Sequence, residues 1–140
     1  MSYDLLVFDS QAAPREQQAF LDWYSTQVDW SETYDYNDPA GTTPELRSWF
    51  DEMIQNWPPM NGPLATDDVD DPHMSDYSIG PHVIYIAFAW SCADEAYLVT
   101  RQLAEKHQVG FFGVSSQGEI IFPDGQTLST TPDKPWWKFW

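Results

Sequence analysis

Cysteine is almost absent from the sequence, and a long apolar run is missing altogether. Cys92 is the only cysteine, so no intramolecular disulfide can form, and nothing indicates an oxidising compartment. The longest apolar run, residues 83–90, is far shorter than the ~20 residues that span a bilayer. The first ten residues include acids but no base, which is unlike a secretory signal peptide. These absences predict a soluble, cytoplasmic protein.

Basic side chains are also scarce. Six Lys and Arg residues face 22 Asp and Glu residues, for a formal net charge of −16, and no base lies between Arg47 and Arg101. Such a surface repels anionic lipids and nucleic acid, because duplex DNA carries one negative charge per ~1.7 Å of its axis. It attracts a basic protein, and electrostatic steering can raise association rates about 10- to 1,000-fold. We therefore expect a basic protein partner and neither nucleic acid nor a membrane.

Sequence motifs of catalysis and metal binding are missing as well. There is no G-x-S-x-G motif, P-loop or dinucleotide-binding glycine pattern. The oxygens of residues 67–71 suit calcium, but His73 stands where an EF-hand requires glycine. Cys92 and His107 could form a nucleophile pair, although a free cysteine is more often a small core hydrophobe. We expect that the protein is not an enzyme and that it binds neither a metal nor a cofactor.

The remaining composition supports a folded domain. The chain is 42% apolar and 16% aromatic over 140 residues, which is enough for one hydrophobic core. Apolar patterns predict strands at 3–9, 76–79, 82–90, 109–115 and 119–122, and helices at 15–28, at 44–56 and after Ser91.

The order β-α-α-β-β-α-β-β predicts a single α+β domain over residues 1–125. We expect a mainly antiparallel sheet of about five strands with three helices on one face, nearest to the ferredoxin-like split β-α-β topology. Residues 82–90 are apolar on both strand faces, so they are expected inside the sheet. Thr43, before Pro44, and Ser91 are the predicted N-caps of the second and third helices. Residues 126–140 form a tail with an aromatic end.

Two acidic segments fall in predicted loops and are interleaved with aromatic residues. Aromatic anchors within a charged rim are typical of protein-binding hot spots. A bland alternative is that the aromatics cover the core and the acids keep the chain soluble, but a net charge of magnitude ~2–8 suffices for that. The predicted partner-binding residues are Asp67, Asp68, Asp70, Asp71, Asp76, Glu32, Asp35, Asp38, Trp30, Tyr34 and Tyr36.

The aromatic end, "PWWKFW", must pack on the domain, on a sister subunit or on a partner, because exposed apolar patches of this density are rare. Packing on the domain is the interpretation that we favour. A homo-oligomer remains open.

Several blocks of sequence carry a resemblance to a known group. The blocks "YDLLVFD", "WPPMNGPLA", "SDYSIGPHVIYIAFAW" and "VGFF" with "GEIIFP" resemble small acidic bacterial proteins, among them immunity proteins of interbacterial toxin systems. The resemblance implies a cytoplasmic protein that binds a cognate toxin domain and inhibits it by occluding the active site.

The alternative function is a small enzyme or a protein that binds a carbohydrate or another small ligand. It requires one concave pocket that gathers Trp30, Trp57 or Trp90 beside two carboxylates.

Overall fold

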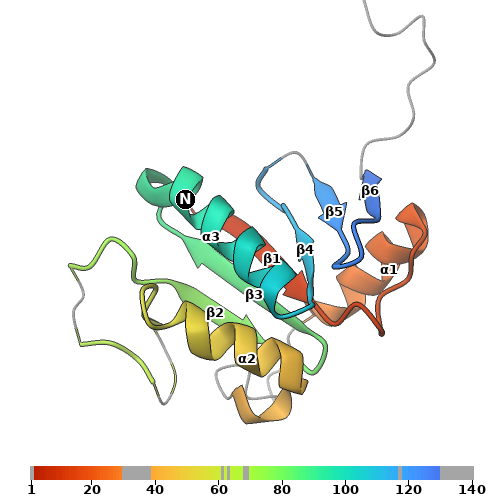
Figure 1. Ribbon diagram of the computed structural model, residues 1–140. Coiled ribbons are helices and arrows are strands. Elements are labelled where there is room, and N and C mark those ends of the chain that lie inside the picture. Colours follow the sequence, from red (N-terminus) through yellow and green to blue (C-terminus); the bar gives the residue numbers. More distant parts are fainter. Residues whose placement is uncertain are drawn as a thin grey trace, which may run out of the picture.

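The computed structural model describes residues 2–29, 39–60, 62, 64–67, 70–116 and 118–129. Among these residues, no helix has the length and apolar character to cross a membrane. The elements, shown in Figure 1, are β1 (Tyr3–Phe8), α1 (Gln17–Gln27), the 3-10 helix η1 (Pro39–Gly41), α2 (Pro44–Met53), β2 (Asp76–Ile79), β3 (Val83–Phe88), the 3-10 helix η2 (Trp90–Cys92), α3 (Ala93–Lys106), β4 (Gly110–Phe112), β5 (Glu119–Ile121) and β6 (Thr127–Ser129).

The described strands form one sheet in the order β2-β3-β1-β4-β5-β6, and every neighbouring pair is antiparallel. β3 separates β1 from β2, and β1 separates β3 from β4. β1, α2, β2, β3, α3 and β4 therefore form the predicted split β-α-β topology. α1 is an additional helix before α2, and β5 and β6 extend the sheet beyond β4. The predicted α+β class is confirmed, and β3 lies inside the sheet as expected.

β1 supplies side chains to two separate cores, because successive side chains of a strand point to opposite faces. Leu5 and Val7 join the core beneath α2 and α3, whereas Leu6 and Phe8 join the core beneath α1. The larger core also buries Trp49, Phe50, Met53, Trp57, Tyr77, Ile79, Ile84, Ile86, Phe88, Ala96, Ala104 and Phe111.

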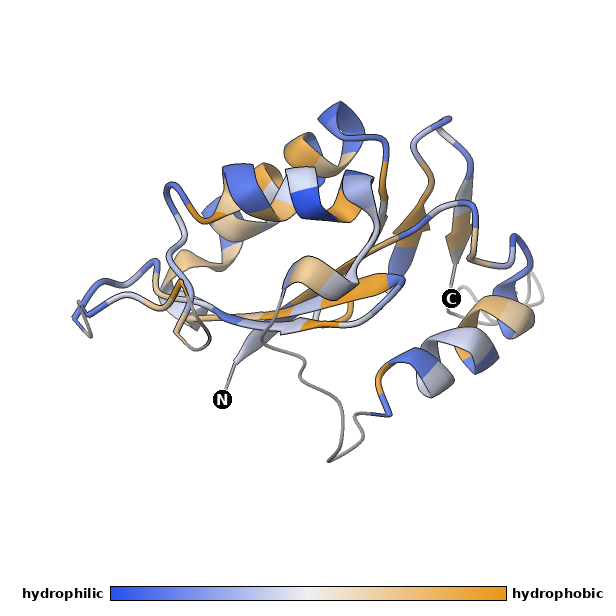
Figure 2. Ribbon diagram, turned by 90° about the horizontal axis from the view of Figure 1, so that it is seen from below, coloured by the Kyte–Doolittle hydropathy of each residue, from blue (hydrophilic) through white to orange (hydrophobic). Residues whose placement is uncertain are grey.

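The prediction that all helices lie on one face of the sheet was wrong. α2 and α3 cover one face and α1 covers the other, as Figure 2 shows. Phe20 of α1 is fully buried, and its ring lies 5.0 Å from that of Phe8 in an edge-to-face contact. The physical reason is that Leu6 and Phe8 expose a second apolar face of β1, which needs a cover of its own.

The two predicted helix caps had different outcomes. Thr43 caps α2 as expected, because its Oγ1 accepts a hydrogen bond from the Leu46 N–H at 3.4 Å. Ser91 does not cap α3. The chain first makes the turn η2, so α3 begins at Ala93, and Cys92 occupies the N-cap without a side-chain capping bond.

The sheet continues further along the chain than the sequence indicated. Residues 127–129, assigned above to the tail, form β6 and pair with β5. Residues 130–140, with the aromatic end, lie outside the described residues.

Candidate functional site

The predicted partner-binding residues are described only in part. Asp67, Asp70 and Asp71 lie in the loop between α2 and β2, and Asp76 is the first residue of β2. Asp67 and Asp70 are exposed, whereas Asp71 and Asp76 are half-buried. The other predicted residues lie outside the described residues: Asp68, Trp30, Glu32, Tyr34, Asp35, Tyr36 and Asp38.

The loop that carries these acids is closed at its base by backbone hydrogen bonds. The Met60 N–H donates to the Ser75 carbonyl at 2.8 Å, and the Ser75 N–H donates to the Pro58 carbonyl at 2.9 Å. Ser75 is completely buried. The Thr66 N–H adds a bond to the Pro59 carbonyl at 2.8 Å. The two ends of the loop are therefore held side by side.

His73 fastens the same loop to the core and to α3. Its ring stacks on the buried Trp57 indole, with centroids 4.0 Å apart and planes 10° apart. Its Nδ1 lies 3.0 Å from the Asn56 carbonyl oxygen, and its Nε2 lies 3.1 Å from Glu95 Oε2. These contacts come from the turn after α2, from the core and from α3, so they restrict the loop close to its acidic residues.

A groove of about 430 Å³ lies beside this loop at the β2 edge of the sheet. Among the described residues, no lysine or arginine lines it. Met60 is 43% exposed at the groove, and Leu64 in the neighbouring turn is 47% exposed. We call this surface the acidic groove; its lining is Ser2, Met60, Asp71, Pro72, Met74, Asp76, Ala87, Phe88 and Ala89.

The two carboxylates of the acidic groove have different contacts. Asp71 Oδ1 accepts a hydrogen bond from the His73 N–H at 2.9 Å, so Asp71 also shapes the turn. Asp76 stands opposite Ala87 on the face of the sheet that α1 covers elsewhere. Sequence reasoning missed the apolar floor of the groove, since Met60 and Met74 sit in a proline-rich segment without periodicity. The only sequence signal was their presence beside the aspartates.

The described cations lie away from the acidic groove, and three of them are engaged by carboxylates. Arg15 bonds Asp124 at 2.8 Å, Arg47 bonds Asp51 at 2.9 Å and Lys106 bonds Glu52 at 2.8 Å. These three pairs place described positive charges at other carboxylates of the chain.

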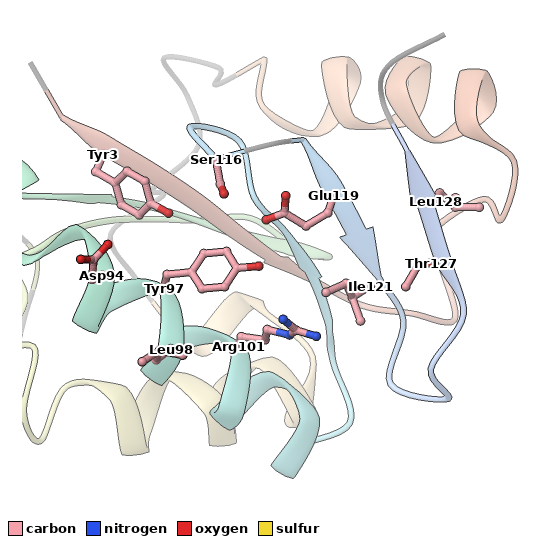
Figure 3. A pocket seen from close by; sticks show the side chains of 10 residues that line it. All are labelled: Tyr3, Asp94, Tyr97, Leu98, Arg101, Ser116, Glu119, Ile121, Thr127 and Leu128. Carbon is pink, nitrogen blue, oxygen red and sulfur yellow. The ribbon is translucent and has the colours of Figure 1, made fainter. Parts of the chain in front are cut away.

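A second and larger hollow, of about 1050 Å³, lies between α3 and the β5–β6 edge. It gathers two carboxylates, Asp94 and Glu119, but its aromatic residues are tyrosines (Figure 3). Trp57 is buried in the core, and Trp90 lies edge-on to Tyr3 at 5.1 Å. Among the described residues, this hollow is lined by two carboxylates but by no tryptophan, and Trp30 lies outside the described residues.

Within the described part of the chain, no three His, Cys, Asp or Glu side chains gather closely enough to hold a metal ion. The chemistry available at the acidic groove is recognition by charge and by apolar contact. Comparison of the chain with protein-family models, with curated proteins and with solved structures finds no match.

Proposed function

We propose that the chain is a protein-binding module that recognises a basic protein through the acidic groove. The observation that carries this proposal is the exposure of Met60 and Leu64 inside a loop that contains aspartates and neither lysine nor arginine. Apolar side chains at the centre of a patch with charged residues around them are the usual anatomy of a protein interface. Methionine is well suited to such a surface, because its flexible, polarizable side chain adapts to a partner.

The net charge of −16 supports a basic partner rather than an acidic or neutral one. Exposed carboxylates such as Asp67 and Asp70 keep their hydration and act mainly at long range. They accelerate the encounter with a positive surface, and their effect weakens with salt. The apolar side chains then contribute short-range affinity when water leaves the groove.

The fastening of the loop supports the same function. The backbone bonds that join Ser75 to Pro58 and Met60, and the stack of His73 on Trp57, fix the groove before any partner arrives. A surface that is already ordered loses less conformational entropy on binding, so a larger share of the contact energy appears as affinity.

The sequence resemblance narrows the proposal to a class of partner. We propose a cognate bacterial toxin domain, with this chain as the immunity protein that covers its active site in the cytoplasm. A toxin that acts on nucleic acid or nucleotides carries a positive groove, and carboxylates can occupy the places of phosphates there.

The proposal is tested by capture of the partner with matched charge variants. The loop variant is Asp67→Lys with Asp70→Lys, and the helix variant is Asp22→Lys with Glu45→Lys, at exposed positions of α1 and α2. Both change the net charge equally. Wild type and the helix variant should capture the same basic protein from a lysate of the source cell at low salt, and the loop variant should lose it. Equal capture by the loop variant would contradict a role for the loop aspartates beside the acidic groove.

A further inference from the structure

The larger hollow lies where the sheet extends beyond the helices that cover this face. α3 packs over β1 and β4, whereas β5 and β6 continue the sheet beyond it. Ile121 pairs with Phe111 on one side and with Thr127 on the other, so this row of side chains faces α3. Ile121 and Thr127 line the hollow. We call it the tyrosine cavity, after Tyr3 and Tyr97 in its wall.

One wall of the tyrosine cavity is polar. Figure 3 shows the hydroxyl groups of Tyr3, Tyr97 and Ser116 and the carboxylate of Glu119 pointing toward one another. Gly113 makes room for this carboxylate, because a Cβ at that position would stand 2.1 Å from Glu119 Oε1. The carboxylate is thereby folded back against the β4–β5 connection instead of extending into solvent.

The tyrosines of this wall are protonated at neutral pH. Burial raises the pKa of Tyr97 above its ordinary value of 10.0, the charge of Glu119 and the hydrogen bond to it raise it further, and Arg101 lowers it. Burial also raises the pKa of Tyr3, against the hydrogen bond from Ser116 that lowers it. Figure 3 shows the ring of Tyr97 between the guanidinium of Arg101 and the carboxylate of Glu119.

The charge of the cavity favours a cationic ligand. Its described lining carries two carboxylates, those of Asp94 and Glu119, and one guanidinium, that of Arg101. The net charge of the whole chain repels anions. Aromatic rings beside a carboxylate are a common setting for ammonium and guanidinium groups, which gain from both the charge and the ring faces.

We propose that the tyrosine cavity binds a small organic cation, an alkyl guanidinium or alkyl ammonium. Its charged group lies between Glu119 and the rings of Tyr3 and Tyr97, and its alkyl chain lies along Ile121 and Leu128 on the β5–β6 side of the cavity. The same group is carried by free small molecules and by arginine or lysine side chains of a protein. This site is separate from the acidic groove, so neither proposal depends on the other.

The first test is a titration with agmatine, a free alkyl guanidinium, followed by nuclear magnetic resonance of the backbone amides. Saturable shifts should concentrate in α3 and β5. Glu119→Gln keeps the shape of the side chain and should weaken binding at least about tenfold, or ~1.4 kcal/mol. Glu45→Gln on α2 makes the same charge change at an exposed position and should bind like wild type. The absence of saturable shifts at millimolar agmatine, or equal affinity of Glu119→Gln and wild type, would overturn the proposal.

A second pair of variants keeps the test decisive if Glu119→Gln does not fold. Leu98 is 57% exposed and lines the cavity, so Leu98→Arg places a competing guanidinium at its mouth without disturbing the core. Gln102→Arg adds the same charge at an exposed position of α3 that does not line the cavity. Leu98→Arg should weaken agmatine binding severalfold more than Gln102→Arg does. Equal affinities in the two variants would count against the site.

A third titration, with a capped Gly-Arg-Gly peptide, distinguishes a protein side chain from a free small molecule as the natural ligand. A protein side chain as the natural ligand predicts that the peptide binds at least as tightly as agmatine. A free small molecule predicts that agmatine binds and the peptide does not. Either result supports the shared chemistry, whereas failure of both probes overturns it.

Discussion

The acidic groove and the tyrosine cavity are both lined by carboxylates, yet they differ in the exposure and in the neighbours of those carboxylates. In the acidic groove the carboxylates surround exposed apolar side chains such as Met60, and no described base lines it. In the tyrosine cavity the carboxylate of Glu119 is half-buried, flanked by hydroxyl groups and accompanied by Arg101. Exposed carboxylates steer a large partner, whereas a partly desolvated one discriminates between single charged groups. Charge alone therefore does not identify the ligand; the exposure and the neighbours of the charge do.

Trp57→Ala is expected to give the largest difference between its effects on the two sites. Trp57 is 1% exposed, and its ring stacks on that of His73. It also packs edge-to-face with Phe88 of the acidic groove, with ring centroids 5.3 Å apart. Its removal leaves a large void, so the free energy of unfolding should fall by about 3–5 kcal/mol. Urea denaturation measures this loss. Agmatine binding to the tyrosine cavity should persist in the folded fraction, and its disappearance would show that the two sites are not independent.

A smaller and more local effect is expected from His73→Ala. This change removes the stack on Trp57 and the contacts to Asn56 and Glu95, so stability should fall by about 1–2 kcal/mol. Hydrogen exchange at the Met60 and Ser75 amides should accelerate, because the loop base loses its support. His82→Ala is the control, because His82 is partly exposed and makes a weak contact, with 3.4 Å between its Nδ1 and Asp9 Oδ2. Equal exchange in both variants would contradict the anchoring role of His73.

The opposite perturbation, at the tyrosine cavity alone, is Gly113→Ala. The added Cβ meets the flexible end of Glu119, so the carboxylate moves and stability should change by less than about 1 kcal/mol. Agmatine binding should weaken at least about tenfold, while partner capture by the acidic groove is unchanged. Gly110→Ala provides the contrast, because its Cβ would meet the buried Phe8 ring at 2.1 Å and should cost about 1–3 kcal/mol or more. Unaltered agmatine affinity in Gly113→Ala would remove Glu119 from the site.

The smallest effect is a pH dependence that belongs to neither site. Hydrogen bonds from Lys106 and His107 lower the pKa of Glu52 below its ordinary value of 4.5, and they join α2 to α3. A carboxyl with a lowered pKa in the folded state contributes stability that is present above pH 4.5 and is lost as the pH falls through the folded pKa. The urea midpoint of wild type should therefore decline below pH 4.5 more steeply than that of Glu52→Gln. Parallel declines would show that Glu52 makes no such contribution.

The order of the elements and the core faces were predictable, because apolar periodicity is a local property. Residues 82–90 alternate between two apolar faces, and the structure places Val83 and Tyr85 on one side and Ile84, Ile86 and Phe88 on the other. The Thr43 cap was predictable for the same reason, since a cap and its helix are neighbours in sequence.

The remaining features depend on contacts between distant segments. The side taken by α1 follows from Leu6 and Phe8, which need a cover only once β1 is inside the sheet. β6 is short and largely polar, and pairing with β5 defines it. The tyrosine cavity joins Tyr3 to Glu119 from opposite ends of the chain, and no periodic pattern links them. The apolar floor of the acidic groove was missed because loop residues carry no spacing signal.

The most direct test of the central claim is the association rate constant of the captured partner, measured by stopped flow over a series of salt concentrations. The acidic groove predicts that Asp67→Lys with Asp70→Lys slows association at least about tenfold at low salt, and that the difference shrinks as salt rises. Asp22→Lys with Glu45→Lys, which changes the net charge equally, should slow it far less. Equal rates for the two variants at low salt would show that the charge of the loop beside the acidic groove has no special part in binding, and the proposed electrostatic steering would be contradicted.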